Sequence, residues 1–310
     1  MKVVVTNRTG FTKEMCQVIA DAGFELMYHD DEQKTPFTEE EKQCEVLWTH
    51  NAFSYNNMDE FPNLKLVMAA MVGLDVQPLE EFKRRGITFC NARGVYDIPI
   101  AEFVLMRLLE MQKKAYVFEE QKRTRSWQQL RLLGHLNDKK AAVLGTGGIG
   151  KQIAKRLVAF DVDVTGYNRS GKEQEYFHRV HKISALAEEI GQYDMVIIAL
   201  PKDATTVDLI NKAMLSKMKE TAILVNVGRG GIVNEKDLHE ALTNHTIAAA
   251  ALDVYETEPL QKESPLWDLE NFYFSPHNSY SSAQNDEQMF AWMMENLCNY
   301  RDGKPLKNIV

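Results

Sequence analysis

The stretch Val143-Leu144-Gly145-Thr146-Gly147-Gly148-Ile149-Gly150 decides the fold. It places a GxGxxG pattern between an apolar strand and the start of a helix. Such glycines allow a tight turn, a close approach of backbone to a pyrophosphate and close packing of helix on strand, while the helix N-terminus supplies N–H donors. A surface glycine turn is the alternative interpretation, but the strand, the helix and the following strand all fall where a mononucleotide unit needs them. The sequence therefore predicts a dinucleotide site that includes Gly145, Gly147, Gly148, Ile149 and Gly150.

Outward from this loop, short β-branched runs alternate with amphipathic helical stretches, which is typical of βαβ units around a parallel sheet. Beyond Gly134 the pattern is regular, and five or six strands with intervening helices predict a doubly wound sheet. The expected strands of this series include Ala141–Leu144, Val162–Tyr167, Met195–Ala199, Ala222–Val227 and Ile247–Asp253.

The N-terminal part predicts a second, smaller α/β domain. Its expected elements are the strands Lys2–Thr6, Val46–Thr49, Leu64–Ala69 and Ile87–Cys90 and a helix from about Thr12 to Ala22. One long helix is expected over Ile98–Arg123, because apolar residues recur there at helical spacing. The last helix, roughly Ala283–Tyr300, is too short to be a domain, and we expect it to pack back on the first one.

Composition limits the classes of protein to which the chain can belong. At about 100–200 residues per domain, its 310 residues allow about two domains, and 36 Lys+Arg against 44 Asp+Glu give a net charge of −8. That balance argues against a nucleic-acid binder. No apolar run approaches the roughly 18–20 residues that span a bilayer, and the start lacks the apolar region of a signal peptide. The four cysteines are widely separated, so we expect reduced thiols and a cytoplasmic protein.

The residues that end the strand after the glycine loop indicate which dinucleotide binds. A carboxylate there would accept hydrogen bonds from the ribose hydroxyls and repel a 2′-phosphate. This chain has Asn168, Arg169 and Ser170 instead, followed by Lys172. An uncharged amide, a guanidinium and a hydroxyl suit the extra phosphate of NADP, so NADP is favoured over NAD. A solvated polar loop is the alternative.

An arginine, a carboxylate and a histidine each follow an expected strand of the same sheet. Arg229 follows Ala222–Val227, Glu258 lies in the segment that begins at Asp253, and His277 follows Tyr273–Ser275. An arginine can hold a substrate carboxylate by forked hydrogen bonds, and a histidine can pass a proton to or from a carbonyl oxygen. Each residue alone could be an ordinary surface or capping residue, but their order after the glycine loop favours a catalytic site.

These patterns together resemble the D-isomer-specific 2-hydroxyacid dehydrogenase family, and the resemblance runs over nearly the whole chain. The motifs that carry it are Val72-Gly73-Leu74-Asp75, Ala101-Glu102, the glycine loop, Leu200-Pro201 with Thr206, Asn226-Val227-Gly228-Arg229-Gly230, Asp253-Val254-Tyr255 with Glu258-Pro259, and Ser275-Pro276-His277.

The resemblance implies an oxidoreductase that transfers a hydride between NADP(H) and a small 2-oxo or D-2-hydroxy acid. His277 would donate or accept the proton, Glu258 would keep His277 protonated near neutral pH, and Arg229 would bind and polarise the substrate. Backbone at Val72 and Gly73 would help to bind the substrate carboxylate. Other positions would line the cofactor site, namely Leu200, Pro201, Thr206, Val227, Gly228 and Asp253.

The resemblance also implies a split architecture with two Rossmann-like domains. Residues 1–97 and 278–310 would form a flavodoxin-like substrate domain, and residues 98–277 the dinucleotide-binding domain with its doubly wound parallel sheet. A homodimer built partly on the long helix after Ala101-Glu102 is expected, without nucleic-acid or membrane partners.

Departures from the family pattern concern the substrate. The run Asn278-Ser279-Tyr280 replaces the usual apolar residue and glycine after the histidine, so the pocket wall is expected to be more polar. Thr49-His50-Asn51 lacks the arginine with which phosphoglycerate-type members hold a phosphate, and no regulatory domain is evident, so 3-phosphoglycerate is disfavoured. A formate-dehydrogenase-like member would have Gln where this chain has Glu258, so that interpretation is disfavoured too.

Two other interpretations are considered. A non-catalytic NAD(H)-sensing protein of the corepressor type would retain the same three residues, but no added interaction segment is evident. His178 and His181 could chelate a metal from a helix; no third ligand is nearby, so a solvated loop is favoured and no metal is expected.

Overall fold

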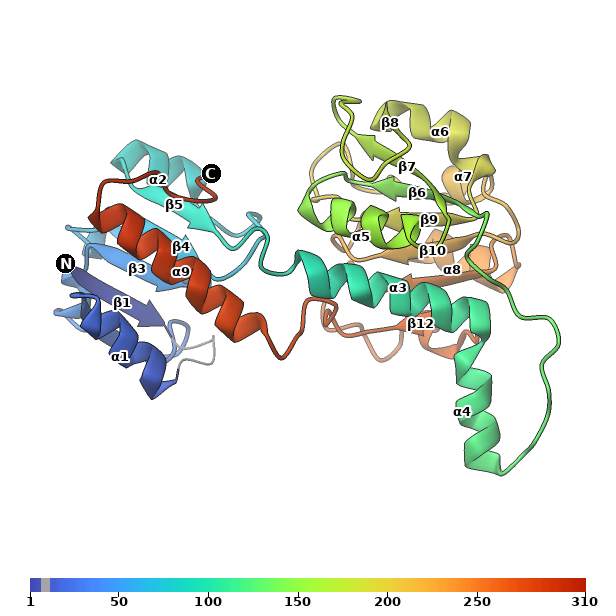
Figure 1. The fold of residues 1–310 in the computed structure, drawn as a ribbon, viewed down its shortest axis with the longest axis horizontal. Coiled ribbons are helices and arrows are strands. Elements are labelled where there is room, and N and C mark those ends of the chain that lie inside the picture. The colour runs from blue at the N-terminus through green and yellow to red at the C-terminus, as the bar shows by residue number, and fades with distance from the viewer. Residues whose placement is uncertain (7–11) are drawn as a thin grey trace. The chain divides into compact units, whose positions relative to one another are not determined.

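The structure is a computed structural model that describes residues 1–6 and 12–310 (Figure 1). It separates into two compact units. The first comprises Met1–Tyr96 and Ser282–Val310, and the second comprises Asp97–Ser281. Each unit is an α/β unit built on a parallel sheet, so the predicted fold class is confirmed. The substrate and dinucleotide roles expected for these parts stay predictions.

The sheet of the first unit has the strand order β2-β1-β3-β4-β5, with every neighbour parallel. This is the flavodoxin-like order, as predicted. Its strands are β1 (Lys2–Thr6), β2 (Glu25–His29), β3 (Val46–Thr49), β4 (Leu66–Ala69) and β5 (Thr88–Asn91), and its helices are α1 (Lys13–Asp21), α2 (Leu79–Arg85) and α9 (Asn285–Arg301).

Both faces of this sheet are covered, because alternate residues of a strand point to opposite sides. In β1, Val3 belongs to the cluster that includes Ile19 of α1, whereas Val4 belongs to the one that includes Phe82 of α2. The C-terminal helix α9 joins the cluster of Val3. Its buried stripe confirms the predicted core packing and consists of Met289, Trp292, Met293 and Leu297.

The sheet of the second unit has the order β12-β11-β10-β9-β6-β7-β8, again fully parallel. The order reverses between β6 and β9, as in a doubly wound sheet. Its strands are β6 (Lys140–Leu144), β7 (Asp163–Asn168), β8 (Arg179–Lys182), β9 (Met195–Ile198), β10 (Ile223–Asn226), β11 (Ala249–Leu252) and β12 (Phe272–Phe274), and its helices are α3 (Asp97–Lys113), α4 (Ala115–Thr124), α5 (Gly148–Val158), α6 (Leu186–Glu189), α7 (Lys212–Leu215) and α8 (Glu235–Thr243).

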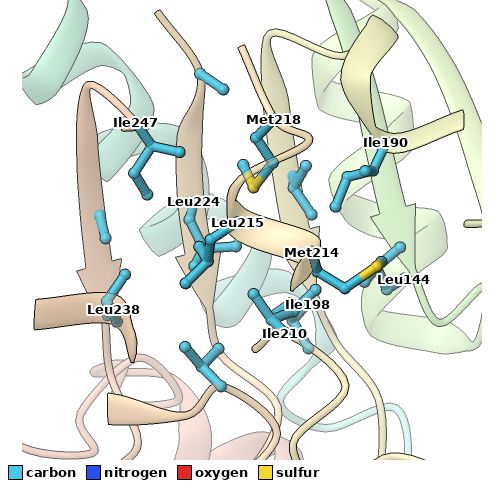
Figure 2. Packing of buried hydrophobic residues seen from close by; sticks show 14 of the residues in the cluster. Leu144, Ile190, Ile198, Ile210, Met214, Leu215, Met218, Leu224, Leu238 and Ile247 are labelled. Carbon is cyan, nitrogen blue, oxygen red and sulfur yellow. The ribbon is translucent and has the colours of Figure 1, made fainter. Parts of the chain in front are cut away.

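The central strands β9, β10 and β11 are buried along their whole length, which is why they read as continuous apolar runs. Figure 2 shows one side of this core, where Ile198 and Leu224 of the sheet meet Met214 and Leu215 of α7. On the other side, α3 packs on α5. The sheet is therefore a rigid base, and its carboxyl edge carries the candidate site.

Three features differ from the sequence predictions. The expected helix over Ile98–Arg123 is broken at Lys114, whose φ of 49° and ψ of 47° are left-handed; the buried stripe of α3 ends at Met111, and α4 buries no residue. The strands β2 and β8 were not anticipated. Both lie at sheet edges, where partly exposed strands carry little periodic signal, and β8 with β12 brings the second sheet to seven strands.

In residues 1–6 and 12–310, no helix is long and apolar enough to cross a membrane. The same residues contain no cluster of three or more His, Cys, Asp or Glu side chains suited to a metal ion. All four cysteines are free, and burial raises the pKa of Cys44 to about 12 and that of Cys90 to about 11.

Candidate active site

The glycine loop leaves β6 at the point where the strand order reverses. Gly145 has a φ of 100°, and a Cβ there would lie 2.4 Å from the carbonyl oxygen of Ala199, which follows β9. A Cβ on Gly150 would lie 1.9 Å from the carbonyl oxygen of Gly145. Side chains at these positions would collide with backbone, so both glycines are required by the turn itself.

A dinucleotide fits the outer part of this loop. Gly147 is the N-cap of α5 and makes no side-chain cap hydrogen bond, and a Cβ there would meet no atom within 4 Å. The first turn of α5, which includes Gly148 and Ile149, carries no acidic residue. At Gly147 the start of α5 is therefore open and carries the positive end of the helix dipole, which is the arrangement that binds a pyrophosphate. The carboxylate of Asp97 lies next to it, since a Cβ on Gly148 would be 1.9 Å from Asp97 Oδ2.

The loop after β7 is organised by Asn168. Its Nδ2 donates to Thr146 Oγ1 (2.8 Å) and to the carbonyl oxygen of Lys172 (3.0 Å), and its Oδ1 accepts from Gly171 N (2.6 Å) and Ser170 Oγ (3.2 Å). Asn168 and Ser170 thus shape the turn, and the side chain of Arg169 is left 86% exposed. Sequence reasoning had assigned all three to the cofactor and had not anticipated that two of them hold the loop.

The loop after β9 is held by a buried threonine. The hydroxyl of Thr206 donates to the carbonyl oxygen of Pro201 (2.9 Å) and accepts from Asp203 N (2.8 Å). A Cβ on Gly228 would lie 2.6 Å from the carbonyl oxygen of Leu200, so the loops after β9 and β10 touch. The predicted cofactor residues of these loops therefore lie beside the glycine loop, at one edge of the sheet.

Arg229 leaves the sheet in a turn that Asn226 closes. Asn226 is 1% exposed; its Oδ1 accepts from Gly228 N (3.0 Å) and its Nδ2 donates to the carbonyl oxygen of Arg229 (3.0 Å). Val227 continues the sheet through a hydrogen bond to Ile198. The sequence motif contained Asn226, but its structural role became visible only from these contacts.

His277 and Glu258 form a direct pair. The Nδ1 atom of His277 lies 2.8 Å from Glu258 Oε2, and Glu258 Oε1 accepts from Tyr255 N (3.0 Å). The side chains are 44% and 37% exposed. Because Glu258 engages Nδ1, the other ring nitrogen, Nε2, is the one available for proton exchange with a substrate.

The turn that carries His277 is held by Asp253, which is 1% exposed. Its side-chain oxygens accept from Asn278 N (2.8 Å) and Ser279 N (3.0 Å), and its carbonyl oxygen accepts from His277 N (2.8 Å). His277 itself has a φ of 50°, which costs a non-glycine residue roughly 1–2 kcal/mol. Asp253, predicted to face the cofactor, stabilises this turn in the structure.

Val72 and Gly73 lie in the first unit, in the loop that follows β4. Asn91 Nδ2 donates to the carbonyl oxygen of Val72 (2.9 Å), and Gly73 is buried. In the same unit, Glu32 accepts from the hydroxyls of Thr6 and Thr49, which end β1 and β3, and it is 2% exposed. Sequence reasoning missed Glu32, since nothing in its local pattern marks it.

The two histidines considered as metal ligands lie on and beside β8. His178 lies in an exposed bend, as the favoured interpretation as a solvated loop predicted, whereas His181 lies in the strand itself, where that interpretation was wrong. His181 Nδ1 lies 2.7 Å from Glu189 Oε2, and His178 Nδ1 lies 2.9 Å from Asp163 Oδ1. Glu189 also accepts from the buried Tyr167 hydroxyl. Burial raises the pKa of Glu189, but these hydrogen bonds outweigh it and leave the pKa lowered. The histidines therefore anchor an edge strand.

Comparison with known proteins agrees with this geometry. Residues 105–279 match the model of the D-isomer specific 2-hydroxyacid dehydrogenase NAD binding domain. The chain is 31% identical over 301 residues to a glyoxylate reductase of Korarchaeum cryptofilum. This alignment covers 93% of this chain and 90% of the relative. It is 32% identical over 249 residues to a D-3-phosphoglycerate dehydrogenase of Archaeoglobus fulgidus, covering 80% of this chain but only 47% of that longer relative.

A solved structure shows the same fold across the whole chain. The NADPH-dependent glyoxylate/hydroxypyruvate reductase of Sinorhizobium meliloti, in complex with citrate, aligns with a TM-score of 0.84 at 26% identity, covering 100% of this chain and 97% of that one. The glycine loop, the parallel seven-stranded sheet and the family match lead to one conclusion: the chain belongs to the D-isomer specific 2-hydroxyacid dehydrogenase family of NAD(P)-dependent oxidoreductases.

Proposed function

We propose that this protein is an NADP-preferring 2-oxo acid reductase that forms a D-2-hydroxy acid, with His277, Glu258 and Arg229 as its catalytic residues. The observation that carries the proposal is the 2.8 Å contact between His277 and Glu258. Together with Arg229, these residues follow three neighbouring strands, β10, β11 and β12, whose carboxyl ends share one edge of the sheet. Two similar proteins bear the names of glyoxylate or hydroxypyruvate reductases.

The mechanism follows from what each side chain can do. A nicotinamide cofactor supplies the hydride when bound, and the carbonyl carbon of the 2-oxo acid accepts it. His277 Nε2 donates a proton to the carbonyl oxygen, which becomes the hydroxyl group. Glu258 holds the ring through Nδ1, and Arg229 binds the substrate carboxylate by forked hydrogen bonds. The reverse reaction returns the proton to Nε2.

The preference for NADP is proposed from the loop after β7. No carboxylate ends that strand, and the exposed guanidinium of Arg169 is suited to a phosphate. Gly145, Gly147, Gly148, Ile149 and Gly150 would hold the pyrophosphate.

A panel assay tests these proposals. The purified protein is mixed with NADPH or NADH and with glyoxylate, hydroxypyruvate or branched-chain 2-oxo acids, and the fall in absorbance of the reduced nucleotide is followed. We expect at least one acid to be reduced, with a higher kcat/KM for NADPH. If no acid supports nucleotide oxidation, the catalytic proposal fails and a nucleotide-sensing protein becomes the better interpretation. If NADH is clearly favoured, the NADP proposal fails.

A homodimer is proposed from the segment that follows α3. Helix α4 buries no residue, and beyond it Trp127 and Leu132 are 94% and 90% exposed. Gly134 N then donates to the carbonyl oxygen of Gln112 (2.9 Å), so the segment projects from the sheet and helices of the second unit and returns to the end of α3 (Figure 1). Exposed apolar side chains of this size favour burial against a second copy. Light scattering should give a dimer mass, and the double change Trp127→Ala and Leu132→Ser should give a monomer.

A further inference from the structure

An ion pair between Arg169 and Asp203 joins the two loops that flank the glycine loop. Asp203 is not among the predicted site residues. Arg169 Nη2 lies 3.0 Å from Asp203 Oδ2. Arg169 follows β7 and Asp203 follows β9, and both strands are neighbours of β6 in the sheet. The guanidinium expected to meet the 2′-phosphate of NADP therefore already has an anionic partner.

The carboxylate of this pair is the fixed member. Asp203 Oδ1 accepts from Thr205 N (2.7 Å) and Thr205 Oγ1 (2.5 Å), and Asp203 N donates to Thr206 Oγ1 (2.8 Å). The hydrogen bonds from Thr205, with the charge of Arg169, hold the pKa of Asp203 below its usual range. Asp203 is therefore an anion at neutral pH whose position does not depend on Arg169.

The guanidinium is the member that can move. The side chain of Arg169 is 86% exposed, whereas the backbone of its loop is held by Asn168. An exposed ion pair of this kind contributes little net stability. A ligand phosphate can therefore bind the guanidinium of Arg169. The phosphate would then lie next to the negative charge of Asp203.

The negative charge of Asp203 acts against one nucleotide and not against the other. A 2′-phosphate carries up to two negative charges, so Asp203 repels it and competes with it for Arg169. A ribose 2′-hydroxyl has no charge and can donate to a carboxylate. We propose that Asp203 is a specificity-determining residue that limits the preference for NADP and keeps NAD(H) usable. This inference rests on the proposed function.

The test is Asp203→Asn, which is nearly isosteric and keeps an Oδ1 acceptor for Thr205 while it replaces Oδ2 by a donor. Dissociation constants for NADPH, NADH, 2′,5′-ADP and 5′-AMP are measured by calorimetry on the full chain. We expect NADPH and 2′,5′-ADP to bind about threefold to tenfold more tightly at low ionic strength, and NADH and 5′-AMP to change less than twofold. The gain in affinity for NADPH and 2′,5′-ADP should shrink in 0.5 M salt, because the Debye length falls to about 4–5 Å at that ionic strength.

Thr205→Val is the matched control, because it removes a hydroxyl contact to Asp203 and leaves the charge in place. It should leave the ratio of the NADPH and NADH constants unchanged. If Asp203→Asn tightens all four ligands equally, or none of them, the inference is overturned while the proposed function stands. If the wild-type protein binds neither nucleotide, the proposed function is overturned and the role of Asp203 with it.

Discussion

Two hydrogen-bonded pairs of ionisable side chains lie at the carboxyl edge of the same sheet, and they are built differently. In the pair of His277 and Glu258 both members are oriented by nearby backbone, since His277 N donates to Asp253 and Glu258 accepts from Tyr255 N. In the pair of Arg169 and Asp203 only the carboxylate is fixed, and the guanidinium is on a long, exposed side chain. The first pair suits a proton transfer that needs one fixed geometry. The second pair suits an arginine that can leave its carboxylate partner and bind a ligand phosphate instead.

The largest effect is expected where the proton donor of the first pair is removed. In His277→Asn, the amide Nδ2 can still donate to Glu258, but no group remains to pass a proton. General acid catalysis contributes about 10²–10⁴-fold, so kcat for 2-oxo acid reduction should fall by about 10³-fold. The dissociation constant of NADPH, measured by fluorescence, should change less than twofold. Unchanged turnover would remove His277 from its proposed role.

A smaller effect is expected from the group that supports the first pair. Asp253→Asn replaces one of two acceptors by a donor that faces a backbone N–H, so the turn of Asn278 and Ser279 shifts. A misplacement of about 1 Å can cost roughly 10²-fold in rate, so kcat should fall by about 10–100-fold. Affinity for NADPH distinguishes the two roles of Asp253, because it should weaken strongly only if Asp253 contacts the nucleotide.

For the second pair, Arg169→Ala should act on one nucleotide only. We expect the dissociation constant of NADPH to rise by about tenfold, which corresponds to loss of about 1.4 kcal/mol of binding free energy, and that of NADH to stay within twofold. Calorimetry on the same preparation measures both. An equal loss for both nucleotides would contradict a role of Arg169 at the 2′-phosphate.

The smallest effect on activity is expected at the opposite edge of the sheet. Asp194 precedes β9 and accepts from Lys140 N (2.9 Å) and Lys219 Nζ (2.9 Å). Burial raises the pKa of Asp194, but these contacts outweigh it and leave the pKa below its ordinary 3.8. Asp194→Asn should leave kcat unchanged and lower the free energy of unfolding by about 1–2 kcal/mol at pH 7.

The sign of the pH effect at Asp194 follows from linkage. A lowered folded-state pKa stabilises the fold above the unfolded-state value of about 4, and this stabilisation is lost as the pH falls through the folded-state pKa. Denaturant unfolding at pH 7 and pH 3 should therefore show a smaller gap between wild type and variant at the lower pH. A gap that does not depend on pH would mean that packing, not charge, explains the loss.

The parts of the fold that were predicted are those whose burial requires a recognisable hydrophobic pattern in the sequence. Strands such as β9 and β10 are buried on both faces and appear as apolar runs. The edge strands β2 and β8 were missed because each has a neighbour on one side only and keeps exposed polar residues. The break at Lys114 was missed for a different reason: no glycine or proline marks it in the sequence.

The sequence by itself determined the dinucleotide loop, the two parallel sheets and the order of Arg229, Glu258 and His277, because each rests on residue types that one local conformation or one chemistry requires. Only the tertiary structure decided the roles of Asn168, Asp253 and Asp203. Their partners come from other loops or from the far side of a turn, and the same carboxylate or amide could equally have faced solvent. Hydrogen bonds across a sheet edge depend on strand order, which no single stretch of sequence contains.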